Sequence, residues 1–271
     1  CIDFIFYFLS LNCNVMKRSN SKIISISNQK GGVGKTTSAV NIASYLAATE
    51  TSTLLVDMDP QANSTSGVGV EAGSYQKSVY DIIVKKSKVK QVIQKTKLDF
   101  LDIIPSSSQL VGAEIELVSE MSREYMLKDS LDLVRDKYEY IIIDSPPSLG
   151  LLTLNVLTAS DSIIIPIQCE YYALEGLGQL VGNVDLVKAN LNPDLEISKI
   201  VLVMYDSRTK ISKQVADEVR EYFGERVCAQ VIPRSVRLSE APSYGQPITV
   251  FDPTSRGSVA YKELAREVLY E

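Results

Sequence analysis

The 271-residue sequence contains no histidine. Histidine is the usual general base near neutral pH and the commonest side-chain ligand of transition metals. Its absence means that other groups must fill these roles in this chain. Any chemistry that the protein performs must therefore depend on carboxylates, lysines, backbone amides or a bound metal ion.

Cysteine and net positive charge are also scarce. The four cysteines, Cys1, Cys13, Cys169 and Cys228, have no C-x-x-C spacing, which argues against a zinc site and against a disulfide framework. We therefore expect reduced thiols. The formal net charge of −5 argues against a protein that coats nucleic acid through its global charge, although a local basic patch stays open.

The one conspicuous apolar run near the start, residues 1–11, is too short to span a bilayer. It also lacks the positive region of a signal peptide. Because Met16 is followed by two basic residues, it resembles a natural start. We expect residues 1–15 to be a non-functional upstream extension, with a short hydrophobic anchor as the alternative. Residues 16–271 are expected to form a single domain, since they contain no repeat and no long linker.

The composition of the rest is that of an ordinary soluble globular protein, with 45% apolar and 23% charged residues. Continuous apolar runs of strand length alternate with helical patterns, which is typical of a parallel sheet covered by helices on both faces. We therefore predict an α/β fold with a mostly parallel, doubly wound sheet. The predicted strands are 23–26, 53–56, 100–105, 140–144, 162–167 and 200–204. Residues 60–73 are expected to form a loop, and one long helical pattern runs through Leu127, Leu131 and Val134.

Residues 28–37, Asn-Gln-Lys-Gly-Gly-Val-Gly-Lys-Thr-Thr, lie between the first predicted strand and a helical pattern. Strand, glycine-rich loop and helix form the context in which a phosphate-binding loop works. The glycines allow backbone N–H groups to curl around an anion, and the helix adds the positive end of its dipole. Lys35 would reach the β- and γ-phosphates, and the Thr36 hydroxyl would ligate Mg²⁺. The sequence departs from the strict motif at Gln29, where glycine is expected, and it carries a second lysine, Lys30.

Aspartates follow two other predicted strands. Asp144 ends the strand 140–144, where a carboxylate holds the Mg²⁺ shell of a phosphate-loop protein, often through water. Ligands of such sheets bind at the carboxyl ends of the strands, so Lys35, Asp59 and Asp144 are expected to meet there. Without histidine, a carboxylate near the γ-phosphate is the reasonable group to orient the attacking water. Asp57 falls on the same side as Asp59 if the strand continues that far, and a part in the metal network is the alternative role for it.

A lysine-rich segment follows. Residues 77–97 contain seven lysines and one acid, a local charge of 7 − 1 = +6. The usual interpretation of such a run is a solvated helix face, and a contact with nucleic acid is the alternative.

The segment 30–37 resembles the deviant Walker A motif of the ParA/MinD ATPase superfamily. Three further blocks in matching order resemble the chromosomal ParA (Soj) branch, and the resemblance covers nearly all of residues 22–270. The blocks are 55–61 (Leu-Val-Asp-Met-Asp-Pro-Gln), 143–150 (Ile-Asp-Ser-Pro-Pro-Ser-Leu-Gly) and 232–242 (Ile-Pro-Arg-Ser-Val-Arg-Leu-Ser-Glu-Ala-Pro). This resemblance implies an ATPase with a deviant phosphate-binding loop that uses ATP and Mg²⁺.

The resemblance also implies roles for individual residues. Lys30 matches a lysine that crosses a face-to-face dimer interface to the phosphates of the partner's ATP, as an arginine finger does. Asp59 matches an aspartate required for hydrolysis. Ser235 stands where the family commonly has asparagine on the adenine side. The implied nucleotide contacts are Lys30, Gly31, Gly32, Val33, Gly34, Lys35, Thr36 and Thr37 in the loop, and Pro233 and Ser235 on the adenine side.

For DNA, the resemblance points to Arg208 and Arg237, whose counterparts belong to a surface assembled only in the ATP dimer. Charge alone would not nominate this surface. Residues 199–240 hold eight basic and six acidic side chains, a difference of 8 − 6 = +2. Contacts of this kind go to phosphates and carry no sequence information.

The expected function is therefore that of a chromosome- or plasmid-partitioning ATPase in the cytoplasm, associated with the nucleoid. ATP would drive homodimerisation, the dimer would bind double-stranded DNA non-specifically, and a ParB-type centromere-binding protein would stimulate hydrolysis. The alternative is a MinD-like membrane-associated positioning ATPase, which requires a basic amphipathic C-terminal helix. The polar face of the pattern 261–269 mixes acids and bases, which favours packing onto the sheet. We therefore expect no stable membrane association.

Overall fold

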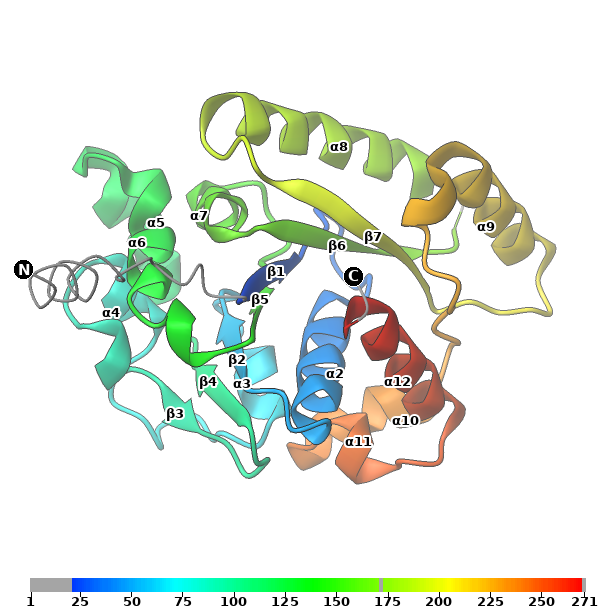
Figure 1. The fold of residues 1–271 in the computed structure, drawn as a ribbon, viewed down its shortest axis with the longest axis horizontal. Helices are drawn as coiled ribbons and strands as arrows, with labels where there is room; N and C mark the ends of the chain where they lie inside the picture. Colours follow the sequence, from blue (N-terminus) through cyan, green and yellow to red (C-terminus); the bar gives the residue numbers. More distant parts are fainter. Residues whose placement is uncertain (1–20, 171–172, 270–271) are drawn as a thin grey trace, which may run out of the picture.

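The computed structural model describes residues 21–170 and 173–269, so the expected extension 1–15 lies outside the described residues. Seven strands form one sheet in the order β3-β4-β2-β5-β1-β6-β7, with helices on both faces (Figure 1). Only the short edge strand β3 runs antiparallel to its neighbour. The predicted α/β class with a mostly parallel, doubly wound sheet is confirmed. The strands are β1 (Lys22–Ile26), β2 (Thr53–Asp57), β3 (Gln94–Lys95), β4 (Leu101–Ile104), β5 (Tyr140–Asp144), β6 (Ser162–Gln168) and β7 (Glu196–Val203).

The helices connect these strands and cover the sheet. They are α2 (Lys35–Ala48), α3 (Asn63–Gly67), α4 (Val79–Ile83), α5 (Leu110–Glu116), α6 (Met126–Asp132), α7 (Leu151–Ala159), α8 (Ala173–Asn190), α9 (Lys210–Phe223), α10 (Val236–Glu240), α11 (Ile248–Phe251) and α12 (Arg256–Leu269).

Side-chain alternation along the strands divides the core into layers. Ile24 and Ile26 of β1 pack with α2 and α12, whereas Ile23 packs on the opposite face with α4, α6 and α7. Successive side chains of a strand point to opposite faces, so continuous apolar runs are needed when both faces are covered. A third cluster lies between α8, α9 and the strands β6 and β7.

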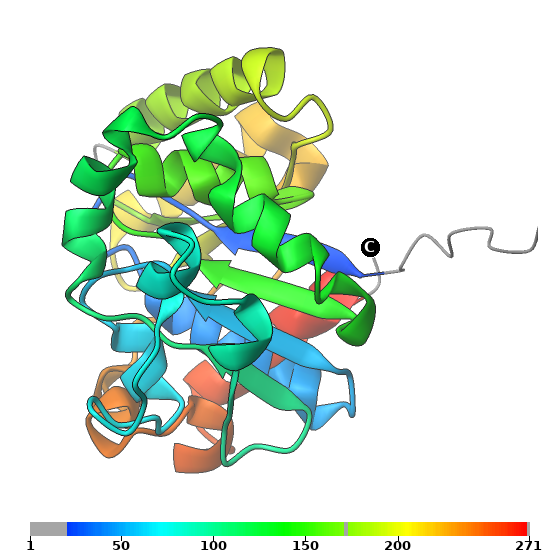
Figure 2. The same ribbon diagram turned by 90° about the vertical axis from the view of Figure 1, so that its left-hand side faces the viewer.

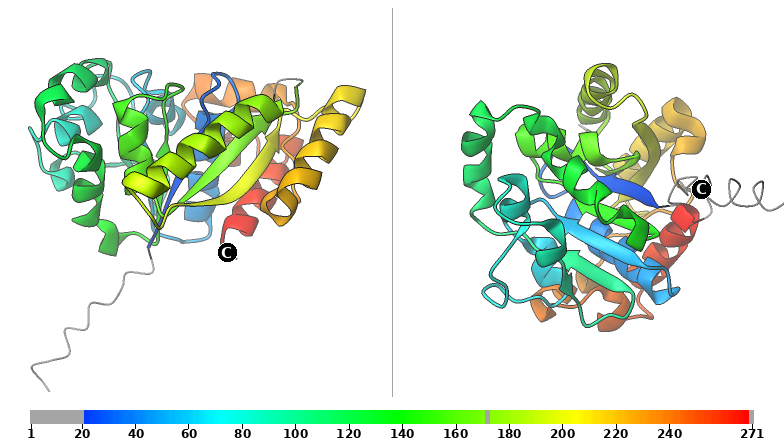
Figure 3. Two further views of the ribbon diagram at one scale, coloured as in Figure 1. Left: turned by 90° about the horizontal axis from the view of Figure 1, so that it is seen from above. Right: turned by 60° about the vertical axis from the view of Figure 1, so that its left-hand side comes forward.

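Three neighbouring strands bring the predicted polar residues to one edge of the sheet. β5 lies between β1 and β2, and the register sets Asp144 opposite both Ile26 and Asp57. In Figure 2 the arrows of these strands point to the left, and in Figure 3 (left) the blue loop after β1 stands at the upper edge to which the strands point. The loops that follow β1, β2 and β5 therefore share the carboxyl edge of the sheet.

Two expectations about connecting segments were wrong. The segment 60–73 is not all loop, because Asn63–Gly67 forms helix α3. The long helical pattern through Leu127 and Leu131 is interrupted, because Glu120 is extended and Ser122 has a positive φ of 56°. A regular spacing of apolar residues indicates which positions are buried, not whether the helix is continuous. The spacing can therefore continue across a break when the helices on both sides pack on the same core.

The lysine-rich segment 77–97 also differs from the helix expected of it. Only Val79–Ile83 is α-helical, and the chain then turns back through a 3₁₀ turn into β3. The N–H of Ser78 donates to the Asp81 carboxylate at 2.9 Å, which holds the start of this short helix. The lysines are therefore spread over several surfaces and do not form one helical face.

The C-terminal pattern forms helix α12, which packs against α2. Leu264, Ala265 and Val268 are buried, and the Tyr261 hydroxyl shares a hydrogen bond of 3.0 Å with Ser38 Oγ of α2. The apolar face of α12 is thus covered by the protein itself. None of the helices within residues 21–170 and 173–269 is both long and apolar enough to cross a bilayer.

Candidate nucleotide-binding site

The loop between β1 and α2 has the backbone shape that an anion site needs. Gly32 and Gly34 have φ values of 73° and 75°, a region that side chains rarely adopt. Gly31 and Gly32 are exposed, and Gly34 caps α2 without any side-chain hydrogen bond. The first N–H groups of this helix have no partner of their own within an α-helix, so they remain donors for a ligand.

Lys35 brings a cation into this loop. Its side chain is buried, and Nζ donates to the carbonyl of Lys30 at 3.0 Å, so the lysine folds back beneath the loop. Burial lowers the pKa of Lys35, and the negative charges of Asp144 and Asp59 act in the opposite direction. The ammonium group therefore lies between the glycine-rich backbone and two carboxylates, where phosphate oxygens would bind.

Asp144 ends β5 and is fully buried. Ser64 Oγ of α3 donates to Asp144 Oδ2 at 2.8 Å, whereas Oδ1 is buried and accepts no hydrogen bond from the described residues. Burial raises the pKa of Asp144, and nearby Asp57 raises it further, while the Thr36 and Ser64 hydroxyls oppose the shift. A buried carboxylate oxygen without a donor is costly. The donor set of Asp144 and Thr36 therefore fits a hydrated Mg²⁺ ion.

Asp57 and Asp59 have different surroundings, which corrects the expectation that both face one way. β2 ends at Asp57, and the Asp59 N–H donates back to Asp57 Oδ1 at 3.1 Å. The other oxygen of Asp57 accepts from the Thr65 N–H at 2.8 Å and from the Thr65 hydroxyl at 2.7 Å. The two bonds from Thr65 hold α3 against β2, so Asp57 is occupied by protein donors.

Asp59 is held more loosely at the rim of the site. Its Oδ1 accepts from the Gln61 N–H at 2.9 Å, and its side chain lies near enough to Lys35 to raise the pKa of that lysine. Only 9% of its surface is exposed. This carboxylate is oriented by one local bond and has accepting capacity left for a water molecule.

Lys30 points away from its own loop. Its Nζ reaches the loop after β6 and pairs with Glu170 Oε2 at 3.1 Å, and both side chains are about half exposed. Its backbone N–H donates to Asn28 Oδ1 at 3.0 Å, which fixes the start of the loop. Exposed pairs of this kind contribute at most about 1 kcal/mol, so a stronger anion can draw the lysine away.

A cavity of about 300 Å³ joins the phosphate loop to the segment predicted for the adenine side. Pro233 and Ser235 line it together with Gly34 and Thr37. Tyr205 pairs with Pro233, and this bridge holds the segment after β7 beside the one that carries the pocket. The remaining lining residues, which the sequence did not nominate, are Val203, Met204, Ile232, Arg234, Leu238, Ser239, Pro242 and Tyr261.

Arg208 and Arg237 lie on these same two segments, after β7 and on α10. Both are exposed and paired with acids. Arg208 makes a two-pronged contact with Asp206 at 2.9 and 2.7 Å, whereas Arg237 reaches Asp252 at 3.0 Å and Glu240 at 3.1 Å. The neighbouring acids partly cancel the charge, in line with the small excess of basic residues in the sequence.

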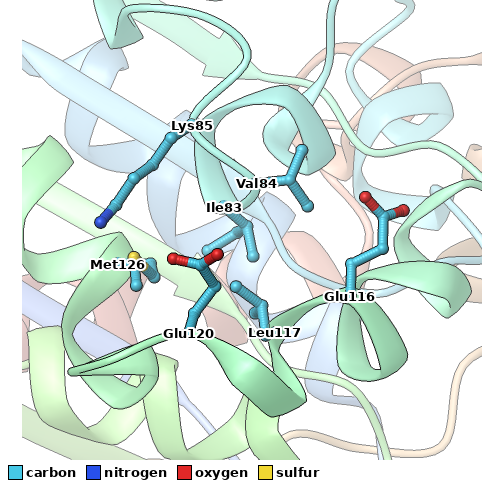
Figure 4. Close-up of a pocket in the computed structure, with 7 residues that line it drawn as sticks. All are labelled: Ile83, Val84, Lys85, Glu116, Leu117, Glu120 and Met126. Atoms are coloured by element: carbon cyan, nitrogen blue, oxygen red, sulfur yellow. The ribbon is translucent and has the colours of Figure 1, made fainter.

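The lysine-rich segment contributes to surfaces that do not include the phosphate loop. Lys85 borders a separate cavity of about 200 Å³, in which Glu116 and Glu120 lie on either side of Leu117 (Figure 4). Lys86 pairs with Glu116 at 3.4 Å and Lys95 with Asp102 at 2.9 Å. The alternative interpretation, that this segment contacts nucleic acid, stays a hypothesis.

The fold and the site together define the class of protein to which this chain belongs. A glycine-rich loop joins the first strand to a helix, its lysine is buried beside two carboxylates, and an aspartate ends the adjacent parallel strand. These are the parts of a phosphate-loop nucleotide-binding protein.

The sequence comparisons identify the family. A family model described as an AAA domain matches residues 21–197. The sporulation initiation inhibitor protein Soj of Bacillus subtilis is 56% identical over 247 residues, 91% of this chain and 98% of that protein. The chromosome partitioning protein ParA of Myxococcus xanthus is 51% identical over 248 residues, 92% of this chain and 88% of that protein. The chain belongs to the Soj/ParA family of chromosome-partitioning ATPases.

A solved structure agrees with the fold. It is that of cobyrinic acid a,c-diamide synthase from Mycobacterium smegmatis with a bound ATP analogue and magnesium. The two chains are 34% identical with a TM-score of 0.81, and the match covers 92% of this chain and 94% of that one.

Proposed function

We propose that this protein binds ATP with Mg²⁺ at the loop 30–37 and hydrolyses it to drive DNA partitioning. The observation that carries the proposal is the meeting of Lys35, Asp59 and Asp144 at the carboxyl ends of three adjacent strands, with one oxygen of Asp144 buried and lacking a donor. The family membership and the nucleotide and magnesium of the Mycobacterium smegmatis structure support the choice of ligand.

In this proposal one set of groups binds the phosphates of the nucleotide and a second set holds the metal ion. The backbone of Gly31, Gly32, Val33 and Gly34 and the start of α2, including Thr37, cradle the phosphates, and Lys35 neutralises them. Thr36 and, through water, Asp144 hold the metal. The metal supplies charge neutralisation on the phosphate oxygens when it is bound. Pro233 and Ser235 border the cavity that would take the nucleoside.

Hydrolysis needs a water molecule held in line with the γ-phosphate. Asp59 is the carboxylate best suited to hold that water, because Asp57 is committed to α3 and Asp144 belongs to the metal. A carboxylate in this role acts mainly by orienting the water and by accepting its proton as the bond to phosphorus forms.

Lys30 links nucleotide binding to pairing of two copies. Its side chain is exposed and extends away from its own phosphate site, so a face-to-face partner would present its triphosphate to it. Without ATP, basic loops would oppose each other, whereas with ATP each lysine would find an anion. The homodimer would then bind double-stranded DNA non-specifically through Arg208 and Arg237, and a ParB-type partner would trigger hydrolysis and release. We propose a single domain for residues 16–271 and a nucleoid-associated location in the cytoplasm.

The MinD-like alternative gains no support from a specific observation. It needs a basic amphipathic helix free to enter a membrane surface, whereas the apolar face of α12 is packed against α2.

The proposed pairing is tested by measuring the mass of the protein in solution. With a non-hydrolysable ATP analogue and Mg²⁺, size-exclusion chromatography with light scattering should give twice the mass found without nucleotide. Lys30→Ala should bind the analogue and stay monomeric, because its loop is intact and only the cation that crosses the interface is lost. A wild-type protein that binds the analogue and remains monomeric up to high concentration would contradict the proposal.

The DNA surface is tested by reversing two charges. The double variant Arg208→Glu/Arg237→Glu should dimerise normally and bind a random-sequence duplex about tenfold or more weakly, because its contacts to phosphate are lost. The same loss should lower the salt dependence of binding. Fluorescence anisotropy at a fixed salt concentration measures the affinity. Arg266→Glu is the control, since Arg266 is an exposed arginine that pairs with Glu263 on α12, with an exposed fraction close to that of Arg237. Equal affinity of the double variant and the wild type at matched salt would remove these arginines from the DNA surface.

A further inference from the structure

Glu114 of α5 touches the segment that follows Asp144, although it lies 30 residues earlier in the chain. Its Oε1 accepts a hydrogen bond from the N–H of Leu152 at 3.4 Å. The same oxygen lies so close to Gly150 that a Cβ placed on that residue would be only 2.1 Å away. The half-buried carboxylate of Glu114 therefore rests directly on the Cα of Gly150 at the start of α7.

The contact with Glu114 provides a side-chain cap for the start of α7. Gly150 is the N-cap of α7 and offers no side-chain cap. The first turn of a helix carries unsatisfied N–H groups and a partial positive charge, so an acidic group there is stabilising. Glu114 thus acts as a cap that reaches α7 from another helix, and the absence of a side chain at Gly150 lets the carboxylate lie this close.

The segment 145–150 is held at its other end by the phosphate-loop strand. The Ser145 hydroxyl donates to the carbonyl of Ile26 at 2.9 Å, and the Ser145 N–H donates to the same carbonyl at 3.3 Å. Between these two attachments, residues 147–149 are exposed. Within the segment, the carbonyl of Ser148 accepts a hydrogen bond from the Thr153 hydroxyl of α7 at 2.5 Å. The segment that continues from Asp144 therefore runs from β1 to the start of α7, where Glu114 of α5 is one of its attachments.

We propose that Glu114 is a positioning residue for ATP hydrolysis: by fixing Gly150 and the start of α7, it sets the path of residues 145–150 beside the phosphates. This inference rests on the proposed ATPase function. Glu114 touches neither nucleotide nor metal in this scheme. It acts through the backbone of a segment whose first residue follows the metal-holding carboxylate, and small displacements of such segments lower rates strongly.

Four variants test the contact from both sides. Glu114→Ala should lower kcat for ATP about tenfold and change KM less than about twofold, because the path of the segment changes and the phosphate loop does not. Glu114→Gln keeps the accepting oxygen and should retain most of the activity. Gly150→Ala should lower kcat by a similar factor, because the added methyl group displaces the carboxylate of Glu114 from the start of α7. The double variant Glu114→Ala/Gly150→Ala should lower kcat no further than either single variant, since both remove the same contact.

Glu116→Ala is the matched control on the same helix, because the carboxylate of Glu116 bonds Tyr80 and Lys86, whereas that of Glu114 bonds Leu152 of α7. It should leave kcat unchanged. Wild-type kcat in Glu114→Ala, or losses that add in the double variant, would overturn the proposal.

A second measurement does not require activity. Hydrogen exchange should show faster exchange of the amides of residues 150–154 in Glu114→Ala than in Glu116→Ala, and equal rates would overturn the proposal. A wild-type protein that fails to hydrolyse ATP would instead refute the proposed function, and this exchange result would still report on the contact.

Discussion

Replacing Lys35 by alanine is expected to abolish ATP binding, with affinity reduced about 100-fold or more. A charge-assisted contact to phosphate within a partly buried loop contributes about 3 kcal/mol, which corresponds to about two orders of magnitude. The side chain is 7% exposed and its ammonium group lies beneath the loop, so no neighbouring lysine can take its place. Lys30, the other cation of the loop, already points outward to Glu170.

The fold should tolerate this substitution. Among the described residues, the Lys35 side chain makes one hydrogen bond, to the carbonyl of Lys30, and burial already disfavours its charged form. Titration calorimetry with ATP and Mg²⁺ measures the loss, and thermal unfolding without nucleotide checks that the variant is folded. Lys30→Ala is the control in the same loop. At concentrations too low for pairing it should keep its ATP affinity within about threefold, because the Lys30 side chain extends away from its own loop to an exposed pair with Glu170. Wild-type affinity in a folded Lys35→Ala protein would contradict the assignment of this loop.

The backbone of the site could be predicted from the sequence because local rules decide it. Glycine at positions 32 and 34 permits the positive φ values found there, and the apolar runs fix parallel strands whose carboxyl ends must meet. These features predict that Asp144 and the loop share one edge of the sheet, whereas the strand order that places β5 beside β1 comes from the structure. The register then sets Asp144 directly opposite Ile26.

Roles that depend on contacts distant in the sequence could not be predicted. Asp57 and Asp59 are two residues apart with the same side chain, yet Thr65 occupies one and leaves the other available. The Thr65 hydroxyl in turn accepts from the Ser106 N–H at 3.0 Å, so the distinction depends on three separate segments. Met204, with a positive φ of 52° at the edge of the nucleoside cavity, carries no signal at all, since methionine does not favour that conformation.

Replacing Asp59 by alanine is expected to stop hydrolysis while leaving ATP bound, so that the dimer persists. Losing the group that orients and deprotonates the attacking water lowers kcat by about 100-fold or more. The fold should be retained, because the Asp59 N–H that donates to Asp57 belongs to the backbone and survives the substitution. The substitution removes one hydrogen bond, which Asp59 Oδ1 accepts from the Gln61 N–H. This bond is a local turn contact at the rim of the site.

Asp59→Ala should differ from a variant that is merely inactive, because it should also remain a dimer. Since hydrolysis would end pairing, Asp59→Ala with ATP should elute as a dimer in size-exclusion chromatography and stay bound to added DNA, whereas the wild type returns to monomer as ATP is consumed. Asp57→Ala is the contrasting control: it removes a buried carboxylate that accepts three hydrogen bonds, so it should lower the free energy of unfolding by about 2 kcal/mol or more. Rapid ATP hydrolysis by Asp59→Ala would remove the carboxylate from the reaction. A hydrolysis-deficient variant that binds ATP and remains monomeric would break the proposed link between the nucleotide and pairing, because in that scheme the bound triphosphate is the anion that each Lys30 needs on the opposite subunit.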